Sequence, residues 1–484
     1  MVLAYPDTVD AKFAEHWDTW FNQPEVDALV SAGINTVRIP LGYWIVEQLV
    51  DRKTEFFARG GMKHLRRGLE QLRKAGIDVI LDHHGLPGVQ SPNQQFTGRC
   101  TSDVQFYTAK NYQRALTWTA VMTTLSHIDP AFATVTQIQA VNEPIMDANQ
   151  TPGYGDFQKS FVLTMRIVEA ILGIFQFPSS LSVTAELLFL ESDIQTAFSK
   201  VCDDTKVKSK FPKEVIQAVF DALPIVLEIS RDLSYDVSFL HFDGRKPNRK
   251  PLISNFMDVN WQYNNPSNPA DAALGPQDYD NHLYYVFGGV ADPVPEAYLI
   301  HICNLDRVQN DAAKGNSPLF FGEWGLPTQF EATDEFLSKW ADAQKMAYSK
   351  GAGWIFWNFK VEPGPNDREW SYLDGLRRGY FTKDPSAYHD PHVCDPYVGK
   401  TFTPSTTSTS TTSSGTNTAV TATTTGTASQ SIATASNGAT VSVSGTSQAT
   451  PTTVSTSSQP TATVSSTGSQ ATATTDTTTT TTTD

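Results

Sequence analysis

Short apolar runs alternate along this chain with amphipathic segments, and this alternation restricts the possible fold more than any other feature. Seven runs have the length and composition of buried strands: 34–40, 77–82, 136–142, 236–242, 279–287, 318–322 and 354–359. Strands that alternate with helices in this way form parallel sheets. We therefore predict an α/β protein whose parallel sheet is covered by helices.

The start of the chain leaves the predicted sheet one strand short. A closed (β/α)8 TIM barrel needs eight strands. Before residue 13, only residues 1–8 form a short, weakly apolar segment that could supply the missing strand. The first residues also lack the basic segment and apolar core of a signal peptide. We expect a TIM barrel that is lacking or truncated in its first strand, in a chain without its natural beginning.

Amphipathic periodicity predicts the helices between these strands. They are expected at 24–32, 62–75, 103–126, 157–173, 215–230, 296–309 and 331–350. Residues 174–215 follow no clear period, and we interpret them as an insertion. The Pro- and Asn-rich stretch 244–276 is predicted to be a loop.

The last part of the chain has a different composition. From Thr401 to Asp484 it consists mainly of Thr, Ser, Ala, Gly and Val, with no Lys or Arg and with Phe402 as its last aromatic residue. Such a segment buries too little apolar surface to offset the entropy of ordering it. We predict a folded domain of residues 1–400 and a disordered, O-glycosylated stalk of residues 401–484.

Charge and cysteine content exclude several classes of partner and site. The net charge is −15 and no basic run occurs, which argues against nucleic-acid partners, and no segment is long enough for membrane insertion. We expect a monomer. The four cysteines form no CxxC pair, so we predict no metal site of that kind. Two disulfides or buried free thiols both fit the cysteine spacing.

Two glutamates, Glu143 and Glu323, each close an apolar run that reads as a buried strand. In a parallel barrel, side chains at the carboxyl ends of strands face one shared mouth. Two carboxylates that face one cleft are the minimum apparatus for cleaving a glycosidic bond. A single glutamate in this position is more often a turn or helix-cap residue, but the repeated placement favours catalysis.

Six motifs occur in an order that resembles glycoside hydrolase family 5, and most closely its fungal exo-beta-1,3-glucanases. They are TVRIPLGYW at 36–44, LDHHG at 81–85, NEP at 142–144, DNHLY at 280–284, GEW at 322–324 and GWIFWN at 353–358. The resemblance spans about residues 13–400 and implies a (β/α)8 barrel with a retaining mechanism. Members of that family begin with a strand carrying a sugar-binding glutamate, which has no match here.

The resemblance implies a role for each matching residue. Glu143 matches the acid/base and Glu323 the nucleophile, while Arg38 matches a cation beside the nucleophile. Tyr284 has a phenol that can orient Glu323. The remaining matches are expected to bind sugar, with the last two as an entrance clamp: Asn142, His84, His282, Trp357, Phe96 and Phe287. Cys303 and Cys394 match positions that family members join by a disulfide.

These residues lead to a functional hypothesis with two alternatives. We expect a retaining hydrolase, acting outside the cell or in the cell wall, that releases glucose from beta-1,3-glucan through a glycosyl-enzyme on Glu323. No cofactor is implied, because the carboxylate pair supplies both nucleophile and proton donor. The alternatives are an endo-beta-1,6-glucanase or other family 5 glycanase, and an inactive carbohydrate-binding wall protein.

Overall fold

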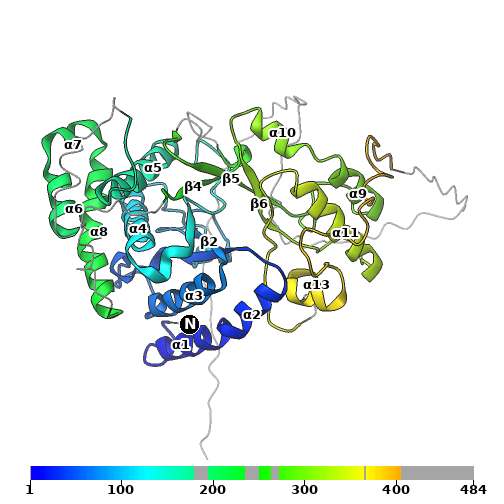
Figure 1. Ribbon diagram of the computed structural model, residues 1–484, viewed down its shortest axis with the longest axis horizontal. Coiled ribbons are helices and arrows are strands. Elements are labelled where there is room, and N and C mark those ends of the chain that lie inside the picture. Colours follow the sequence, from blue (N-terminus) through cyan, green and yellow to red (C-terminus); the bar gives the residue numbers. More distant parts are fainter. Residues whose placement is uncertain (1, 179–193, 235–249, 263–271, 365–366, 405–484) are drawn as a thin grey trace, which may run out of the picture. The chain divides into compact units, whose positions relative to one another are not determined.

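A computed structural model describes residues 2–178, 194–234, 250–262, 272–364 and 367–404 (Figure 1). Six strands form one parallel sheet in the order of the chain. They are β1 (Thr36–Gly42), β2 (Asp78–Gly85), β3 (Val135–Gln139), β4 (Ile253–Met257), β5 (Gln277–Leu283) and β6 (Leu319–Trp324). Sequential order and parallel direction make this sheet an incomplete TIM barrel, so the predicted α/β fold is confirmed.

The predicted last strand lies beside β6, although it pairs only through an isolated bridge. Trp354 bridges Phe321 in parallel, and the backbone N–H groups of Ile355 and Trp357 donate to the carbonyls of Phe321 and Trp324, both at 2.8 Å. This segment and β1 are the two ends of the described sheet. No described strand joins them.

One described strand was not predicted from the sequence pattern. The predicted strand 236–242 lies outside the described residues, and β4 occurs inside the stretch 244–276 that we predicted as a loop. β4 carries the polar residues Ser254 and Asn255, both fully buried, and Asn255 Nδ2 donates to Asp278 Oδ1 at 2.7 Å. Because buried polar partners replace apolar side chains here, the strand lacks the expected apolar pattern.

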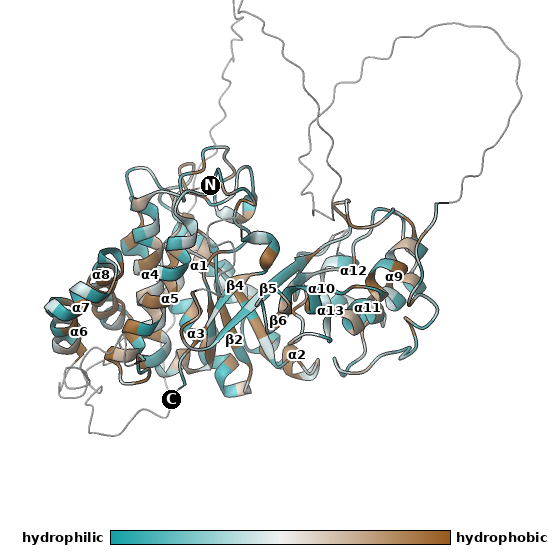
Figure 2. Cartoon of the chain, turned by 90° about the horizontal axis from the view of Figure 1, so that it is seen from above, coloured by the Kyte–Doolittle hydropathy of each residue, from teal (hydrophilic) through white to brown (hydrophobic). Residues whose placement is uncertain are grey.

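Thirteen helices surround the sheet in the described part of the chain. They are α1 (Val9–Trp20), α2 (Gln23–Ser31), α3 (Gly61–Ala75), α4 (Ala109–Ile128), α5 (Tyr154–Ile171), α6 (Ile194–Asp203), α7 (Thr205–Lys210), α8 (Lys213–Asp232), α9 (Pro295–Cys303), α10 (Arg307–Ala312), α11 (Asp334–Tyr348), α12 (Asp367–Trp370) and α13 (Tyr372–Arg378). Figure 2 shows α6, α7 and α8 gathered beyond α4 and α5, on the side away from the strands. Within the described ranges, every helix is too short or too polar to cross a membrane.

Most predicted helices are present, and one prediction needs correction. The single helix expected at 296–309 is divided into α9 and α10, because the Asn304 side chain donates to the Ile300 carbonyl at 2.7 Å and the chain turns there. The stretch interpreted as an insertion contains α6 and α7 in its described part, and the sequence pattern had left its structure open.

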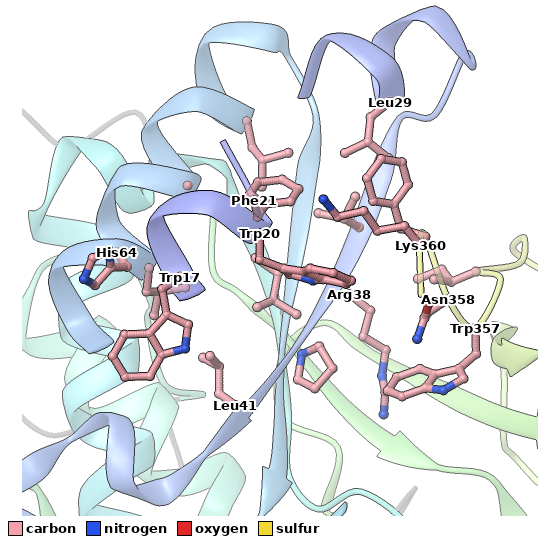
Figure 3. Close-up of a pocket in the computed structure, with 18 of the residues that line it drawn as sticks. Trp17, Trp20, Phe21, Leu29, Arg38, Leu41, His64, Trp357, Asn358 and Lys360 are labelled. Carbon is pink, nitrogen blue, oxygen red and sulfur yellow. The ribbon is translucent and has the colours of Figure 1, made fainter. Parts of the chain in front are cut away.

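An apolar cavity of about 600 Å³ separates β1 from the 353–360 segment (Figure 3). Trp17 and Trp20 of α1 and Phe21 form much of its wall. Lys360 lies over the Trp20 ring at 4.4 Å. The cavity is therefore where a strand joining the two ends of the sheet would lie, and α1 borders it instead.

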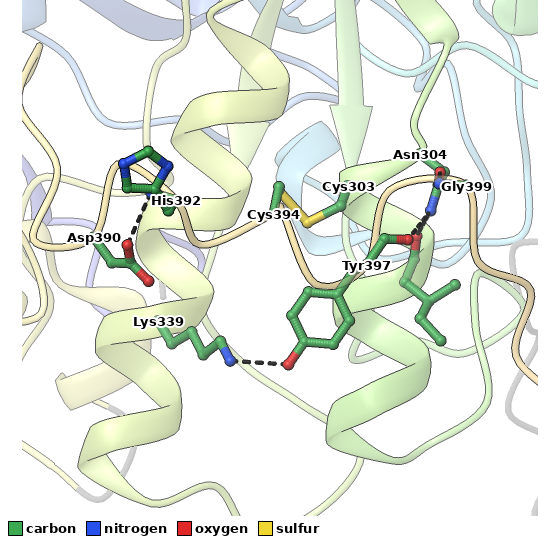
Figure 4. The surroundings of a disulfide bond; sticks show 9 residues. Cys303, Asn304, Lys339, Asp390, His392, Cys394, Tyr397 and Gly399 are labelled. Carbon is green, nitrogen blue, oxygen red and sulfur yellow. Dashed lines mark hydrogen bonds between the residues drawn. A yellow bond between two sulfur atoms is a disulfide. The ribbon is translucent and has the colours of Figure 1, made fainter.

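A disulfide attaches the C-terminal segment to the helical layer (Figure 4). Cys303, the last residue of α9, is bonded to Cys394, as the resemblance implied. Beside it, Asn304 Oδ1 accepts from the Gly399 backbone N–H at 2.7 Å, and Lys339 Nζ donates to the Tyr397 hydroxyl at 2.9 Å. Cys100 and Cys202 are free thiols.

Candidate active site

The carboxyl ends of the strands bring the two glutamates together. Glu323 lies in β6 and is only 5% exposed, and Glu143 lies in the loop that follows β3. His282 of β5 is between them, with Nδ1 2.7 Å from Glu143 Oε1 and 3.5 Å from Glu323 Oε2. One ligand atom from each of the three residues lies within 4.8 Å of the others. The two carboxyl groups are thus close enough to act on one glycosidic bond, as in retaining glycosidases, where they lie ~5–5.5 Å apart.

Glu323 is held on both oxygens. Arg38 Nη1 donates to Oε1 at 2.7 Å, and the Tyr284 hydroxyl donates to Oε2 at 3.0 Å. The pKa of Glu323 lies above its ordinary value, because burial and the Glu143 carboxylate raise it more than His282 and Arg38 lower it. The hydrogen bonds fix the direction of this carboxylate, as a nucleophile requires.

Glu143 has an unusual backbone conformation. Its φ is 40°, in the left-handed region that a residue with a side chain rarely adopts. The Ser91 hydroxyl donates to its carbonyl at 2.5 Å, and the side chain is 15% exposed. Strained backbone of this kind is retained chiefly where the surrounding structure and function require it. The conformation directs the carboxyl group toward His282 and Glu323.

Asn142 presents a free hydrogen-bond donor in the same place. Its Oδ1 accepts from Arg38 Nη2 at 2.7 Å, which fixes the orientation of the amide. Its Nδ2 is buried without a partner among the described residues. A buried unpaired N–H is costly, so it is suited to bind a group on a ligand, such as a sugar hydroxyl.

The aromatic residues expected at the sugar site lie in two groups. His84 stacks on Trp357 with ring centroids 5.5 Å apart and 7° between the planes, and Phe96 approaches His84 edge-on. Phe287 is 57% exposed and contacts Tyr284 instead, with centroids 5.6 Å apart. The structure therefore groups Phe96 with His84 and Trp357, and Phe287 with Tyr284.

Three fully buried residues behind this site were not assigned a role from the sequence. Asp82 Oδ2 contacts Arg38 Nη2 at 3.1 Å and His84 Nδ1 at 2.6 Å. Asp280 lies beneath His282, and Gln139 Oε1 accepts from Arg38 at 2.7 Å. The sequence did contain a signal: both aspartates stand two residues before a histidine, and residues at that spacing share one strand face.

The same trio also has the spacing of a metal site. Glu143, His282 and Glu323 form the one group of three or more potential ligands found in the described ranges. Burial alone would lower the pKa of His282, but the carboxylates of Glu323 and Asp280 raise it well above its ordinary value. A protonated imidazole donates hydrogen bonds, and the 2.7 Å contact of His282 Nδ1 with Glu143 Oε1 fits such a donor.

The large apolar cavity is adjacent to this cluster and distinct from it. Arg38 and Trp357 line one end of the cavity (Figure 3), whereas neither Glu143 nor Glu323 does. Its wall is mainly apolar, while the glutamates are surrounded by charged and amide groups. The cavity and the two glutamates therefore form two separate environments.

Comparison with known proteins gives relatives over most of the chain. No protein-family model matches. The chain is 28% identical to glucan endo-1,6-beta-glucosidase B of Emericella nidulans, over 80% of this chain and 78% of that protein. It is 25% identical to a probable glucan 1,3-beta-glucosidase A of Neosartorya fischeri, over 80% of each. Among solved structures, the rutinosidase from Aspergillus niger matches 75% of this chain and 83% of its own at 16% identity, with a TM-score of 0.46.

Proposed function

We propose that this protein is a retaining beta-glucan hydrolase of the family 5 type that cleaves β-1,6 linkages within the polymer. The observation that carries the proposal is the pair Glu143 and Glu323, which meet across His282 with ligand atoms within 4.8 Å. The linkage rests on the similarity to the glucan endo-1,6-beta-glucosidase B proteins, at 28% identity over four fifths of the chain. This similarity favours our alternative hypothesis over the exo-β-1,3 activity that we expected first.

In the first step, Glu143 acts as general acid and Glu323 as nucleophile. Glu143 transfers its proton to the leaving glycosidic oxygen while a Glu323 oxygen bonds to the anomeric carbon, and the carbon–oxygen bond to the leaving sugar breaks. Arg38 and Tyr284 keep the Glu323 carboxylate directed at that carbon. The product is a glycosyl-enzyme in which Glu323 has lost its negative charge.

In the second step, Glu143 acts as general base. It takes a proton from a water molecule, whose oxygen attacks the anomeric carbon and displaces Glu323 as a free carboxylate. The unpaired Asn142 Nδ2 is placed to donate to the sugar 2-hydroxyl, a hydrogen bond that strengthens in the transition state. Two displacements at one carbon return the original β configuration.

Hydrolysis of β-1,3-glucan is the second candidate. The similarity to glucan 1,3-beta-glucosidase A, at 25% identity over 80% of the chain, supports it. Both candidates use the same glutamates, so they differ only in how the sugar chain is oriented by the surrounding loops.

Product analysis on two polymers tests the proposal. We expect pustulan, a β-1,6-glucan, to be cut faster than laminarin, a β-1,3-glucan, with β-1,6-linked oligosaccharides as early products. Glucose as the sole early product would indicate exo action. Glu323→Ala should lose all measurable hydrolysis, and Glu143→Ala should lose at least about 100-fold. Equal measurable activity of wild type and Glu323→Ala would overturn the role of Glu323, and no hydrolysis by either would favour a carbohydrate-binding protein.

We also propose that the protein acts outside the cell. The Cys303–Cys394 disulfide supports this location, since disulfides persist in oxidising compartments. The predicted stalk of residues 401–484 lies almost wholly outside the described residues and stays a prediction, as does the domain boundary at residue 400. Fractionation of the cells of origin, with an antibody against the folded domain, tests the location.

A further inference from the structure

Asp280 is a fully buried carboxylate in β5. Four N–H groups surround its two oxygens. Its Oδ1 accepts from the Gly322 backbone N–H at 2.7 Å, and its Oδ2 accepts from Gln139 Nε2 at 2.9 Å. His282 Nε2 lies 3.4 Å and Arg38 Nε 3.5 Å from the same Oδ2. Four donors around two oxygens match a carboxylate, which only accepts.

The contact with Gly322 sets the position of Glu323. The register between β5 and β6 shifts at this point: Asn281 pairs with Phe321, and His282 pairs with Glu323. Gly322 is thus the extra residue of a bulge, and a Cβ there would lie 2.2 Å from Asp280 Oδ1. Only glycine allows this approach, and bulges commonly redirect a side chain next to an active site.

The other two contacts reach both glutamates through cations. Arg38, on one side of Asp280, donates to Glu323 Oε1 at 2.7 Å. His282, on the other side, has Nδ1 2.7 Å from Glu143 Oε1. The buried Asp280 therefore contacts both Arg38, which holds the proposed nucleophile Glu323, and His282, which holds the proposed acid Glu143.

We propose that Asp280 is a positioning residue that keeps the two catalytic carboxylates in register, through Arg38, His282 and the Gly322 backbone. It touches no reacting atom and acts only through these three groups. The proposal rests on the proposed function for the roles of Glu143 and Glu323, whereas the contacts themselves do not depend on it.

Asp280 also contributes to the charge around His282. That imidazole is faced by Glu143 from the loop after β3, Glu323 from β6 and Asp280 from its own strand, with Asp82 of β2 close enough to interact. Removing one negative charge from this cluster lowers the pKa of every remaining acid in it. Both limbs of the pH–activity profile should therefore move to lower pH.

The test compares Asp280→Asn with Asp278→Asn. The first keeps an oxygen to accept from Gly322 and removes the charge. The second changes another buried aspartate of β5, which bonds Asn255 instead of Arg38, His282 or Gly322. Burial raises the pKa of Asp278 to about 7, so this control leaves the charge nearly unchanged at an acidic assay pH.

We expect Asp280→Asn to fold, to lose at least about tenfold in kcat with KM changed less than threefold, and to shift both pH limbs downward. Asp278→Asn should keep the wild-type profile. The proposal would be overturned if Asp280→Asn kept wild-type kcat and pH profile, or if it lost activity only in proportion to a loss of folded protein.

Titration of His282 by NMR tests the role of Asp280 without depending on whether the protein hydrolyses glucan. Its signal among the ten histidines is assigned by its absence in His282→Gln. A lower His282 pKa in Asp280→Asn, with no change in Asp278→Asn, supports the coupling even in a protein that hydrolyses no glucan. An unchanged His282 titration in Asp280→Asn would overturn it.

Discussion

At the scale of single residues, the site is a set of carboxylates whose charges are balanced by two cations. Arg38 contacts Glu323 and the buried Asp82 and Asp280, and His282 contacts both proposed catalytic glutamates. Buried charges are stable only when they are paired and hydrogen-bonded. The same pairing that stabilises the interior therefore directs the reactive oxygens.

The Tyr284 hydroxyl offers the simplest test of whether hydrogen bonds favour the ionised form of Glu323. Burial, together with the charge of Glu323, raises the pKa of Tyr284 well above its ordinary value, so it stays a donor throughout the assay range. In Tyr284→Phe the Glu323 carboxylate loses one donor, and its pKa rises further. We expect about tenfold lower kcat/KM and an acidic limb shifted to higher pH, measured as a pH–rate profile. An unchanged acidic limb would contradict this account, because Tyr284 would then not stabilise the charged form.

The sequence identified the residues that we propose as catalytic, but not the buried residues that lie behind them. Glu143 and Glu323 could be found because each closes a strand-like run, and Arg38, His84 and His282 because their motifs occur in order. Asp82 and Asp280 were overlooked because their spacing of two residues before a histidine shows a shared strand face but does not show which groups they contact. Their contacts join different strands, and such contacts depend on sheet register, which a single sequence does not specify.

At the scale of secondary-structure elements, the strands around the site could be predicted where they are apolar. β4 was missed because its buried Ser254 and Asn255 are residue types typical of loops. The burial of Asn255 is explained only by its hydrogen bond to Asp278 of the next strand. The division of the 296–309 segment into α9 and α10 likewise depends on one side chain, Asn304. Periodicity predicts that an element exists, whereas local hydrogen bonds decide where it begins and ends.

The disulfide at the end of α9 predicts a specific loss of stability. Cys303 and Cys394 are 91 residues apart, and a cross-link over a loop of this length stabilises the folded state by up to about 4–5 kcal/mol in the chain-entropy model. We expect the double variant Cys303→Ser, Cys394→Ser to unfold at lower denaturant concentration by circular dichroism. Cys100→Ser, which alters an exposed free thiol, is the matched control. Equal midpoints for the double variant and this control would contradict the prediction.

At the scale of the whole molecule, buried acids make the folded state suited to acidic conditions. Burial raises the pKa of Asp258, and burial with the nearby Asp258 charge raises the pKa of Asp311 to about 8. Burial also raises the pKa of Asp278 to about 7. Between the unfolded value near 3.8 and these folded values, the native state binds more protons than the unfolded state. Its stability therefore falls as the pH rises through this window.

Thermal unfolding at several pH values tests whether stability falls as the pH rises. We expect the Tm to decrease from about pH 5 to pH 8, and the decrease to be smaller in Asp311→Asn, which cannot ionise. A Tm that rises over this range, or an identical slope in Asp311→Asn, would show that other groups control the pH dependence. The variant Asp292→Asn, at an exposed position, controls for a general effect of removing one negative charge.

The most direct test of the central claim is the configuration of the first product. Proton NMR of a β-1,6-linked gluco-oligosaccharide during the first minutes of hydrolysis distinguishes the β anomer from the α anomer before they equilibrate. Two displacements, by Glu323 and then by water activated by Glu143, predict that the β anomer appears first. If the α anomer appeared first, the reaction would be a single displacement, and Glu323 would not be the nucleophile.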